Sequence, residues 1–169
     1  MAERERRSSG LARGKIHNRL GSVMTSQKEQ TLVLIKPDGV RRGLIGEIIR
    51  RIEAKGYVVE NLKMSLVSIN QLKNHYQEHE GKPFFEPLLE FMQSGPIVAM
   101  VVSGNRVIEG FRSLAGATEP TNAAPGTIRG DLARDQGTKV VQNLVHGSDS
   151  SESAQREILI FFPELQGVK

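Results

Sequence analysis

The sequence predicts an α+β fold, a βαββαβ sandwich in which helices pack on one face of a four-stranded antiparallel sheet. Three observations carry this prediction. Apolar stretches of strand length alternate with stretches of helical spacing along the chain. One strand-like stretch alternates apolar with polar residues, which is typical of an antiparallel strand with one solvated face. The 169 residues also suffice for one domain with a substantial core.

The first half of the chain predicts two strands around a helix. Residues 31–35, TLVLI, predict a buried strand that stops before the Pro-Asp-Gly stretch beginning at Pro37. Apolar residues at helical spacing predict a helix over residues 44–52, which ends at Gly56. Residues 57–67 predict the second strand, the one with a wet face. Its alternating apolar residues are Leu62, Met64 and Leu66.

The middle of the chain predicts three helices and a central strand. Two short helices are expected over residues 70–79 and 84–93, separated by a glycine and a proline. The wholly apolar stretch at 97–102, IVAMVV, predicts a central strand, and apolar spacing predicts a helix over 107–114. Residues 115–139 are rich in Gly, Pro, Thr and Asp and show no periodicity, so we expect a loop. A loop of that length in a compact domain is usually functional.

The end of the chain predicts a last strand and a last helix. Residues 140–145, VVQNLV, predict the strand. Asp149 and Glu152 form an Asp-x-x-Glu capping box, which predicts a helix from there through Ile158. The resulting order, β-α-β-αα-β-α-loop-β-α, is that of a ferredoxin-like sandwich.

The positive charge of the chain lies in its first 23 residues. Residues 1–23 hold six of the 23 Lys and Arg and two of the 19 Asp and Glu, which leaves 17 of each for residues 24–169. A neutral body has no basic surface of the kind that binds nucleic acid, so we expect no nucleic-acid partner. Without apolar periodicity, residues 1–23 are expected to be a disordered extension outside a domain spanning 24–169.

The sequence also bounds the compartment and the metal chemistry. The longest wholly apolar stretch, residues 97–102, is too short to span a bilayer, and no apolar stretch follows the charged N-terminus as in a secretory signal. We therefore expect a cytoplasmic protein without a membrane partner, although the N-terminal extension could be a targeting arm. The chain has no cysteine, which excludes disulfides and thiolate metal sites.

A five-residue motif, His-x-x-Glu-His at residues 75–79, matches the pattern of inverted zinc peptidases. Its histidines, His75 and His79, would lie one turn apart on a helix, as zinc ligation requires. The predicted helix is short and polar, however, and a pattern with two free positions arises easily by chance. We favour two partly exposed histidines on a solvated helix, with a zinc hydrolase as an alternative that metal analysis would reveal.

Cationic residues at predicted loop positions could form an anion site. Lys36 follows the first strand, Arg112 lies near the end of a predicted helix, and Arg129 shares the long loop with Thr118. Sites often form where strands end and loops begin, and arginine suits bidentate contacts to phosphate. Each residue alone would be an ordinary surface charge, so only their convergence would bind a polyphosphate. Neither Gly-Lys pair of the sequence is followed by Ser or Thr, which excludes a P-loop.

His146 stands after the last apolar stretch and is followed at once by a glycine. A neutral imidazole is a competent nucleophile near pH 7, because its ordinary pKa is about 6.5. Covalent catalysis would let it accept a phosphoryl group and pass it on. Such a ring must be oriented, usually by a carboxylate. Glu157, one helix downstream, could orient it with help from Ser148.

Six motifs along the sequence resemble those of a known family. The motifs that carry the resemblance are, in order, IKPDGVRRG, HY…KPFF, SGPIVAMV, GATEP, PGTIRGD and NLVHGSDSSESAQREI. Together they resemble nucleoside diphosphate kinases over residues 30–162, and the NxxHGSD motif is highly specific. The resemblance implies transfer of the γ-phosphate of a nucleoside triphosphate to a nucleoside diphosphate, which maintains nucleotide pools. It also implies a ping-pong mechanism through a phosphohistidine, with Mg²⁺ on the phosphates, and a homo-oligomer. Of the family's hexamers and tetramers we favour the hexamer.

The resemblance also implies roles for individual residues. His146 would attack through Nδ1, with Ser148 and Glu157 orienting its ring. Phe84 would stack on the base, and Asn143 would bind the ribose hydroxyl together with Lys36. The residues around the phosphates and the histidine would be Lys36, Tyr76, Arg112, Thr118 and Arg129. Stacking tolerates every base, as an enzyme that equilibrates nucleotide pools requires, although Phe84 could instead be a core residue.

Two features of the sequence fit the family pattern less well. Asn143 and His146 are three residues apart, and on a straight strand they would face opposite sides. Either the chain bends there or Asn143 precedes the strand. The stretch at 131–143, DLARDQGTKVVQN, is also longer by about four residues than the commonest family pattern. The remaining alternative is a nucleotide-binding regulatory protein without turnover, whose signature would be loss of His146 or Lys36; the sequence retains both.

Overall fold

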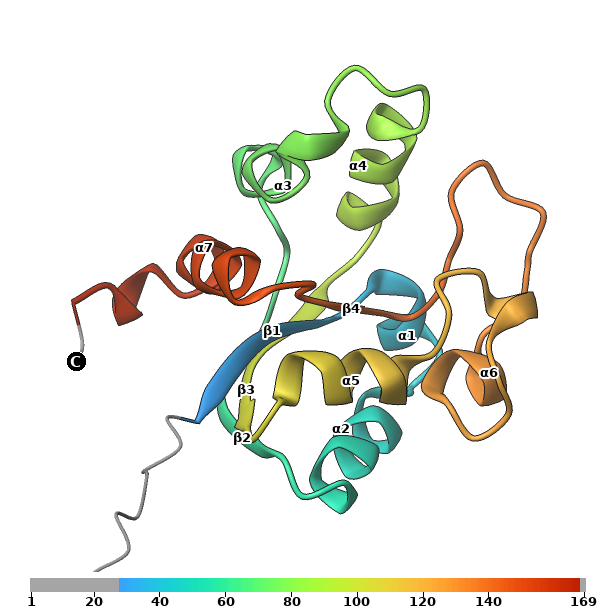
Figure 1. Cartoon of the computed structure of the whole chain (residues 1–169). Helices are drawn as coiled ribbons and strands as arrows, with labels where there is room; N and C mark the ends of the chain where they lie inside the picture. Colours follow the sequence, from blue (N-terminus) through green and yellow to red (C-terminus); the bar gives the residue numbers. More distant parts are fainter. Residues whose placement is uncertain (1–27, 168–169) are drawn as a thin grey trace, which may run out of the picture.

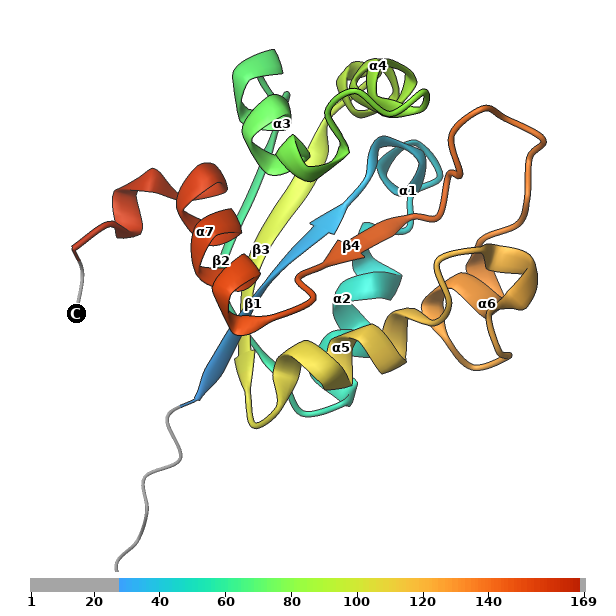
Figure 2. The ribbon, with the colours of Figure 1, turned by 45° about the horizontal axis from the view of Figure 1, so that its top comes forward.

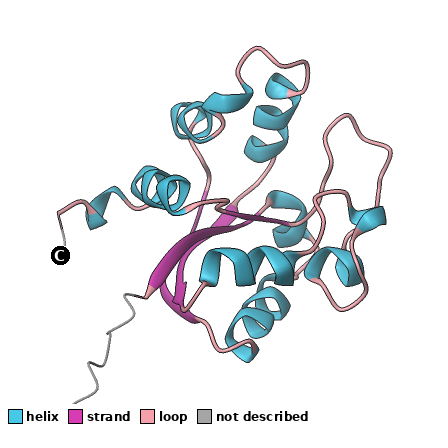
Figure 3. Cartoon of the chain, viewed as in Figure 1, coloured by secondary structure: helices cyan, strands magenta, loops and turns pink. Residues whose placement is uncertain are grey.

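The computed structural model describes residues 28–167 and contains a four-stranded sheet with the strand order β2-β3-β1-β4. Every neighbouring pair of strands is antiparallel (Figures 1 and 3). The strands are β1 (Glu29–Ile35), β2 (Val58–Ser65), β3 (Ile97–Gly104) and β4 (Val145–Gly147). This topology confirms the predicted α+β, ferredoxin-like class. The predictions for residues 1–23 lie outside the described residues.

Helices cover both faces of the sheet (Figure 2). One face is covered by α3 (Ile69–His75), α4 (Phe85–Gln93) and α7 (Ser151–Phe161), and the other by α2 (Ile45–Ala54) and α5 (Val107–Ala115). The shorter elements are α1 (Pro37–Arg41), α6 (Ile128–Leu132), η1 (Gln77–His79), η2 (Pro120–Asn122) and η3 (Pro163–Leu165). Each helix of the described residues is too short or too polar to cross a bilayer.

The prediction that helices cover one face alone is wrong, and the sequence of the central strands gives the reason. β1 and β3 are buried at nearly every position, so both faces of the sheet need a cover. Leu32 and Leu34 pack under α3, α4 and α7, whereas Val33 and Ile35 pack under α2 and α5. Because each buried side chain of this size contributes about 1.5–3 kcal/mol, an uncovered second face would expose much of the core.

Several predicted element boundaries are wrong. The first strand ends at Ile35, as predicted, but the stretch from Pro37 also forms a helix that was not predicted, the single-turn α1 with the proline at its first position. The helix predicted over 70–79 ends at His75 and gives way to a separate 3-10 turn. The predicted loop 115–139 contains η2 and α6. The capping residue of α7 is Ser150, whose hydroxyl accepts the backbone N–H of Ser153. The helix is therefore capped by Ser150 and not by the predicted Asp-x-x-Glu box that begins at Asp149.

Strand β2 exposes apolar residues to solvent. Its alternating pattern had predicted that these residues face the core and that the polar residues face solvent. The exposed fractions are 49% for Val58, 49% for Leu62 and 54% for Met64, and Leu66, just after the strand, is 72% exposed. The strand lies at the edge of the sheet, and its pairing with β3 shifts register between Val59 and Asn61. In the single chain, an apolar surface therefore lies along an unpaired sheet edge.

Candidate active site

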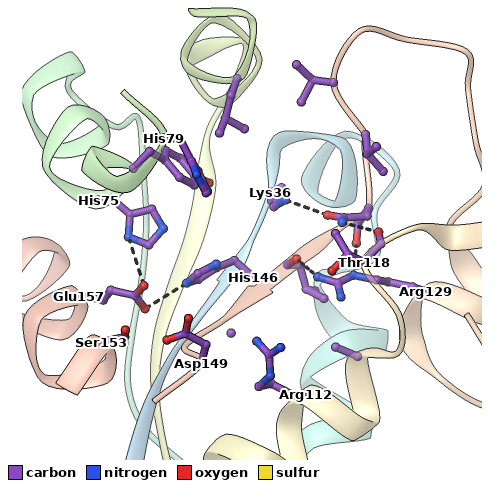
Figure 4. Close-up of a pocket in the computed structure, with 18 of the residues that line it drawn as sticks. Lys36, His75, His79, Arg112, Thr118, Arg129, His146, Asp149, Ser153 and Glu157 are labelled. Atoms are coloured by element: carbon purple, nitrogen blue, oxygen red, sulfur yellow. Dashed lines mark hydrogen bonds and ion pairs between the residues drawn. The ribbon is translucent and has the colours of Figure 1, made fainter. Parts of the chain in front are cut away.

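A pocket of about 650 Å³ gathers residues from both halves of the chain (Figure 4). It is lined by the end of β1, by α3 and α4, by α5 and α6, and by β4 and α7. Ser148 is the single predicted site residue that does not line it. The predicted residues that do are Lys36, Tyr76, Phe84, Arg112, Thr118, Arg129, Asn143, His146 and Glu157. The cationic residues thus converge with the candidate nucleophile.

His146 lies on β4 with its ring turned toward the pocket and toward α7 (Figure 4). Its Nε2 is 3.0 Å from Oε2 of Glu157, whose side chain is only 7% exposed. Because a neutral imidazole has one N–H, a proton on Nε2 facing the carboxylate leaves Nδ1 with a free electron pair. The geometry therefore presents Nδ1 as the reactive nitrogen.

Ser148 acts on the histidine through the carboxylate. Its hydroxyl donates to Oε2 of Glu157 at 2.7 Å and accepts the backbone N–H of Leu32 at 3.1 Å. The serine is fully buried. The hydrogen bond from Ser148 thus fixes the carboxylate oxygen that holds the His146 ring, and the backbone of β1 fixes the serine in turn.

The glycine after His146 is required by close packing. A Cβ at Gly147 would lie 2.4 Å from the Phe111 ring, far inside van der Waals contact. The ring of Phe111 is fully buried under β4. Gly147 therefore lets α5 approach the strand that carries the histidine.

A turn at Leu144 explains how Asn143 and His146 serve one pocket. Leu144 has a left-handed backbone, with φ of 71°, which is costly for a residue with a branched side chain. Its N–H donates to the carboxylate of Asp38 at 3.0 Å, and its carbonyl accepts the N–H of Lys36 at 2.8 Å. The strand predicted over 140–145 is therefore wrong: β4 begins at Val145, and Asn143 precedes it, as one of the two sequence alternatives required.

Lys36 is held by Asn143 at the floor of the pocket. Its Nζ donates to Oδ1 of Asn143 at 2.7 Å, and Nδ2 of Asn143 donates to the carbonyl of Thr118 at 2.7 Å. Burial, and then the nearby Arg129, lower the pKa of Lys36 to about 8, while Asp38 acts in the opposite direction. A buried ammonium of this kind interacts strongly with an incoming anion, because little water screens it.

Arg129 braces the backbone of the site as well as charging it. Its guanidinium donates to the carbonyls of Gly116 at 2.8 Å, Val145 at 2.7 Å and Asn143 at 3.2 Å. Burial, and then Arg112, lower its pKa to about 10. Arg112 itself is exposed on α5 and faces the same pocket. One arginine therefore links the long loop to β4, and the other is free to move toward a ligand.

The expectation for the His-x-x-Glu-His motif is wrong for one of its histidines. His75, at the end of α3, is 4% exposed, and its ring lies 4.6 Å from the ring of His146. His79 lies in the separate turn η1, stacked on Tyr76. The pair therefore does not share a continuous helix, which removes the geometry of a zinc peptidase. The hydroxyl of Tyr76 is buried without a hydrogen-bond partner among residues 28–167, and burial raises its pKa.

Phe84 and its neighbour Phe85 have opposite environments. Phe84 is 41% exposed and lines the pocket, whereas Phe85 is 6% exposed in the core. Val140, on the lengthened stretch before Asn143, lines the same pocket. An exposed aromatic ring at the mouth of a pocket is available for stacking, so the core interpretation of Phe84 does not hold.

Sequence reasoning missed several further residues of the pocket, among them Lys139, Val140 and Asp149. Lys139 and Val140 belong to the lengthened stretch, where no motif gave their position, and Asp149 had been taken for a helix cap. The Asp149 pKa is lowered, chiefly because Ser153 donates a hydrogen bond to its carboxylate. The HGSD motif could have identified Asp149 as a pocket residue, because this aspartate stands three residues after His146.

Comparisons with known proteins found similar chains. The family model described as nucleoside diphosphate kinase matches residues 29–166. A nucleoside diphosphate kinase of Thermobifida fusca is 60% identical over 137 residues, which cover 81% of this chain and 98% of that protein. A nucleoside diphosphate kinase of Mycobacterium tuberculosis is 60% identical over 136 residues, which cover 80% of this chain and 97% of that protein.

Solved structures extend the likeness to three dimensions. A halophilic nucleoside diphosphate kinase from Halobacterium salinarum in complex with CDP superposes with a TM-score of 0.75 at 47% identity, covering 80% of this chain and 88% of that one. An apo nucleoside diphosphate kinase from Encephalitozoon cuniculi gives a TM-score of 0.74 at 39% identity, covering 79% and 88%.

Proposed function

This chain belongs to the nucleoside diphosphate kinase family, and from that premise we propose which of its residues carry the reaction. The enzyme transfers the γ-phosphate of a nucleoside triphosphate to a nucleoside diphosphate in a ping-pong mechanism through a phosphohistidine. His146 is the residue that is phosphorylated. The observation that carries this proposal is the hydrogen bond from its Nε2 to Glu157, which leaves Nδ1 for attack.

Each half-reaction exchanges one bond to phosphorus. In the first, the Nδ1 electron pair of His146 attacks the γ-phosphorus, and the bond to the β-phosphate oxygen breaks as the diphosphate leaves. In the second, a terminal oxygen of the acceptor diphosphate attacks the same phosphorus, and the bond to nitrogen breaks. Glu157 remains ionised and stabilises the positive charge that the ring gains on phosphorylation. No general base is needed, because phosphoryl transfer depends mainly on positioning and charge stabilisation.

The remaining polar residues bind the nucleotide. Lys36, Arg112 and Arg129 offset the phosphate charge, with Thr118 and the Tyr76 hydroxyl as further donors. The unpartnered hydroxyl of Tyr76 supports this role, because a phosphate oxygen would supply the missing hydrogen bond. Asn143 and Lys36 bind the ribose hydroxyl. The complex of the Halobacterium salinarum relative with CDP supports a nucleotide ligand for the pocket.

The base stacks on Phe84. The ring is exposed at the pocket, and Val140 lies on the lengthened stretch that borders the same cavity. Stacking on an aromatic face contributes about 1–3 kcal/mol per base and is tolerant of base identity. We expect the enzyme to accept purine and pyrimidine nucleotides alike.

Mg²⁺ is the proposed cofactor, held mainly by the nucleotide phosphates. Mg²⁺ prefers oxygen ligands and commonly combines substrate phosphates with one or two carboxylates. Asp149 is the pocket carboxylate that fits this description, because it is exposed and its pKa is lowered. When bound, the ion neutralises phosphate charge, while the cationic residues above orient the phosphates.

The exposed apolar edge of β2 supports a homo-oligomer. An unpaired sheet edge carrying apolar side chains is a template for pairing with a second chain. Leu62 and Met64 lie on this edge, half exposed in the single chain. We propose that two copies join along β2 and that such dimers assemble into a hexamer rather than a tetramer. Sedimentation of the protein and of a Leu62→Lys variant tests this, since the charge should dissociate the dimer.

We further propose a cytoplasmic enzyme whose kinase domain spans residues 24–169, with residues 1–23 as an extension. The family match over residues 29–166 supports this boundary. A chain that begins at Met24 should retain full activity. Loss of folding or activity in that chain would place the extension inside the domain.

The nucleophile is tested by mixing the protein with γ-labelled ATP and Mg²⁺ without an acceptor. A phosphohistidine is acid-labile and base-stable, and we expect one label per chain at His146. Added nucleoside diphosphate should remove the label as triphosphate. A label that survives acid, or one found on another residue, would overturn the assignment of His146.

A further inference from the structure

His75 is a buried polar residue without a role in the mechanism above. Its imidazole is 4% exposed, and neither ring nitrogen has a hydrogen-bond partner among residues 28–167. The ring packs edge-to-face on Tyr76, His146 and Phe161 at centroid distances of 4.4, 4.6 and 5.3 Å. Aromatic packing accounts for the carbon edge of the ring, but it leaves both nitrogens unused. A buried polar group of this kind requires an explanation.

The unused nitrogens lie beside the carboxylate and the ring of the nucleophile. Nδ1 of His75 is 3.9 Å from Oε1 of Glu157, and Nε2 of His146 is 3.0 Å from Oε2 of the same group (Figure 4). One donor atom from each of the three residues lies within 4.8 Å of the other two. The carboxylate therefore stands between two imidazole nitrogens.

Two imidazoles and a carboxylate are a common donor set for zinc. Zn²⁺ takes nitrogen and oxygen ligands at about 2.0–2.2 Å in tetrahedral geometry, so its donors stand about 3.4 Å apart. The separations of 3.0 and 3.9 Å run to different oxygens of Glu157, and the three donor atoms lie within 4.8 Å of one another. Closing the set around an ion would therefore take an inward shift of at most about 1.4 Å, the difference between 4.8 and about 3.4 Å.

We propose that His75, His146 and Glu157 form an inhibitory Zn²⁺ site that stops phosphoryl transfer without displacing the nucleotide. This inference rests on the proposed role of His146 as the nucleophile. The metal binds the unphosphorylated enzyme on the Glu157 side of the ring. The phosphate-binding cations, Lys36 and Arg129 among them, lie on the other side (Figure 4).

Inhibition follows from the single proton of the neutral ring. In the active arrangement this proton lies on Nε2 of His146, facing Glu157, and Nδ1 holds the free electron pair. A metal at Nε2 takes the electron pair there, so the proton moves through solvent to Nδ1. The ring neither gains nor loses a proton, but no electron pair remains for attack on the γ-phosphorus. Glu157 stays ionised and becomes a ligand.

The surroundings make the site selective and reversible. Burial, and then the neighbouring His146, lower the pKa of His75 well below its ordinary value, so its ring is neutral and can ligate metal at pH 7. Mg²⁺ prefers oxygen donors and does not compete for imidazoles. Arg156, 3.9 Å from Oε1 of Glu157, opposes a further positive charge, as does the more distant Lys36. We therefore expect binding that EDTA reverses.

Metal binding is tested directly on the unphosphorylated full chain without nucleotide. Calorimetric titration with Zn²⁺ should give one site per chain. His75→Phe keeps an aromatic ring for the packing against Phe161 and removes both nitrogens, so it should lose the site; His75→Gln provides a second variant, and circular dichroism checks that each folds. His79→Gln is the matched control, because His79 belongs to the same motif but lies outside the donor set. It should bind Zn²⁺ as the wild type does.

The chemical consequence is tested with γ-labelled ATP, with and without Zn²⁺ at ten times its Kd. Phosphoenzyme formation should fall to about a tenth in the wild type and in His79→Gln, by mass action. His75→Phe should be insensitive relative to its own metal-free rate. Affinity for ADP, measured in Mg²⁺, should stay unchanged. Zinc binding that survives in His75→Phe, or an equal loss of ADP affinity, would overturn the proposal.

The same experiment separates this inference from the assignment of His146. A metal-free wild type that forms no phosphohistidine would contradict the proposed nucleophile. Normal phosphohistidine formation with no zinc binding would contradict the zinc site alone.

Discussion

The two halves of the pocket hold their residues in different ways. On one side, His146 is oriented by a single hydrogen bond to Glu157, which Ser148 holds in turn. On the other side, contacts are distributed: Arg129 donates to three carbonyls and Lys36 is fixed by Asn143. Phosphoryl transfer thus depends on one contact, whereas binding of the negatively charged phosphates depends on many. Substitutions on the first side should lower kcat, and those on the second should raise Kd.

The strongest test of this division is removal of the nucleophile. His146→Ala should lower turnover by about 10⁴-fold or more, because the covalent intermediate cannot form. The cationic half is untouched, so the Kd for ADP should change by less than about threefold. Single-turnover labelling and calorimetry measure the two effects separately. Full activity in this variant would refute the role of His146, and loss of binding would show that the two halves are not separable.

The next largest effect is expected from Glu157→Gln. The amide keeps the size of the side chain but removes the charge that stabilises the phosphorylated ring, so kcat should fall by about 100-fold. The Kd for ADP should remain at the wild-type value. Serine at position 148 offers the matched control: Ser148→Ala should show a smaller loss of kcat, since it acts through the carboxylate. An unchanged kcat in Glu157→Gln would show that packing alone orients the ring.

Lys36→Met tests the other half. Hydrogen bonds to charged groups contribute about 1.5–3 kcal/mol, so the Kd for ADP should rise by about 10- to 100-fold. Wild-type affinity should also weaken as pH rises through about 8, because the buried ammonium loses its proton there. Burial of the ammonium is the main cause of this lowered pKa; Arg129 lowers it further, and Asp38 raises it. The Kd of the Lys36→Met variant should be insensitive to pH in this window.

The same lysine gives folding stability the opposite dependence on pH. Its folded-state pKa is lowered to about 8, whereas an unfolded lysine titrates near 10.4. Between these values the unfolded chain binds more protons, so the free energy of unfolding should rise with pH. Urea unfolding of the wild type and of Lys36→Met between pH 7.5 and about 10 isolates this contribution. A wild-type stability that falls relative to the variant across this range would contradict the burial of a charged amine.

The smallest effect is expected at the base. Phe84→Ala should raise the Kd by about tenfold, the lower part of the range for stacking on an aromatic ring. The factor should be similar for purine and pyrimidine nucleotides, while kcat at saturation stays nearly constant. Phe85→Leu, in the core, is the control and should affect stability rather than Kd. A loss confined to purines would show that the ring distinguishes bases.

The sequence predicted most of the helices and strands because their signals are local. TLVLI and IVAMVV predicted the two central strands by composition, and the spacing of apolar residues predicted α2 and α5 within a few residues. The errors fall where long-range contacts decide. Leu144 adopts its left-handed turn because Asp38, far away in the sequence, accepts its N–H. No local pattern carries that information, so the strand at 140–145 was misplaced.

The residues of the candidate site were predicted from sequence motifs and not from geometry. The motif residues converge on the pocket, but their contacts could not be inferred from spacing. Ser148 was expected to help orient His146, but spacing could not show that it does so through its hydrogen bond to Glu157. His75 was expected to be partly exposed because its helix is polar, and burial against Phe161 is visible only once α7 is in place. A residue that joins a site only through packing produces no periodic pattern in the sequence.

The contacts that join residues 36–38 to the turn at Leu144 span at least 106 positions of the chain. A polypeptide emerging from the ribosome therefore carries its lysine early, but it has no partner for that lysine until synthesis is almost complete. Partial chains have neither the histidine nor the asparagine in place, and cannot take phosphate from a nucleotide. The enzyme becomes competent only after β4, which carries His146, and α7, which carries Glu157, have both packed against the sheet.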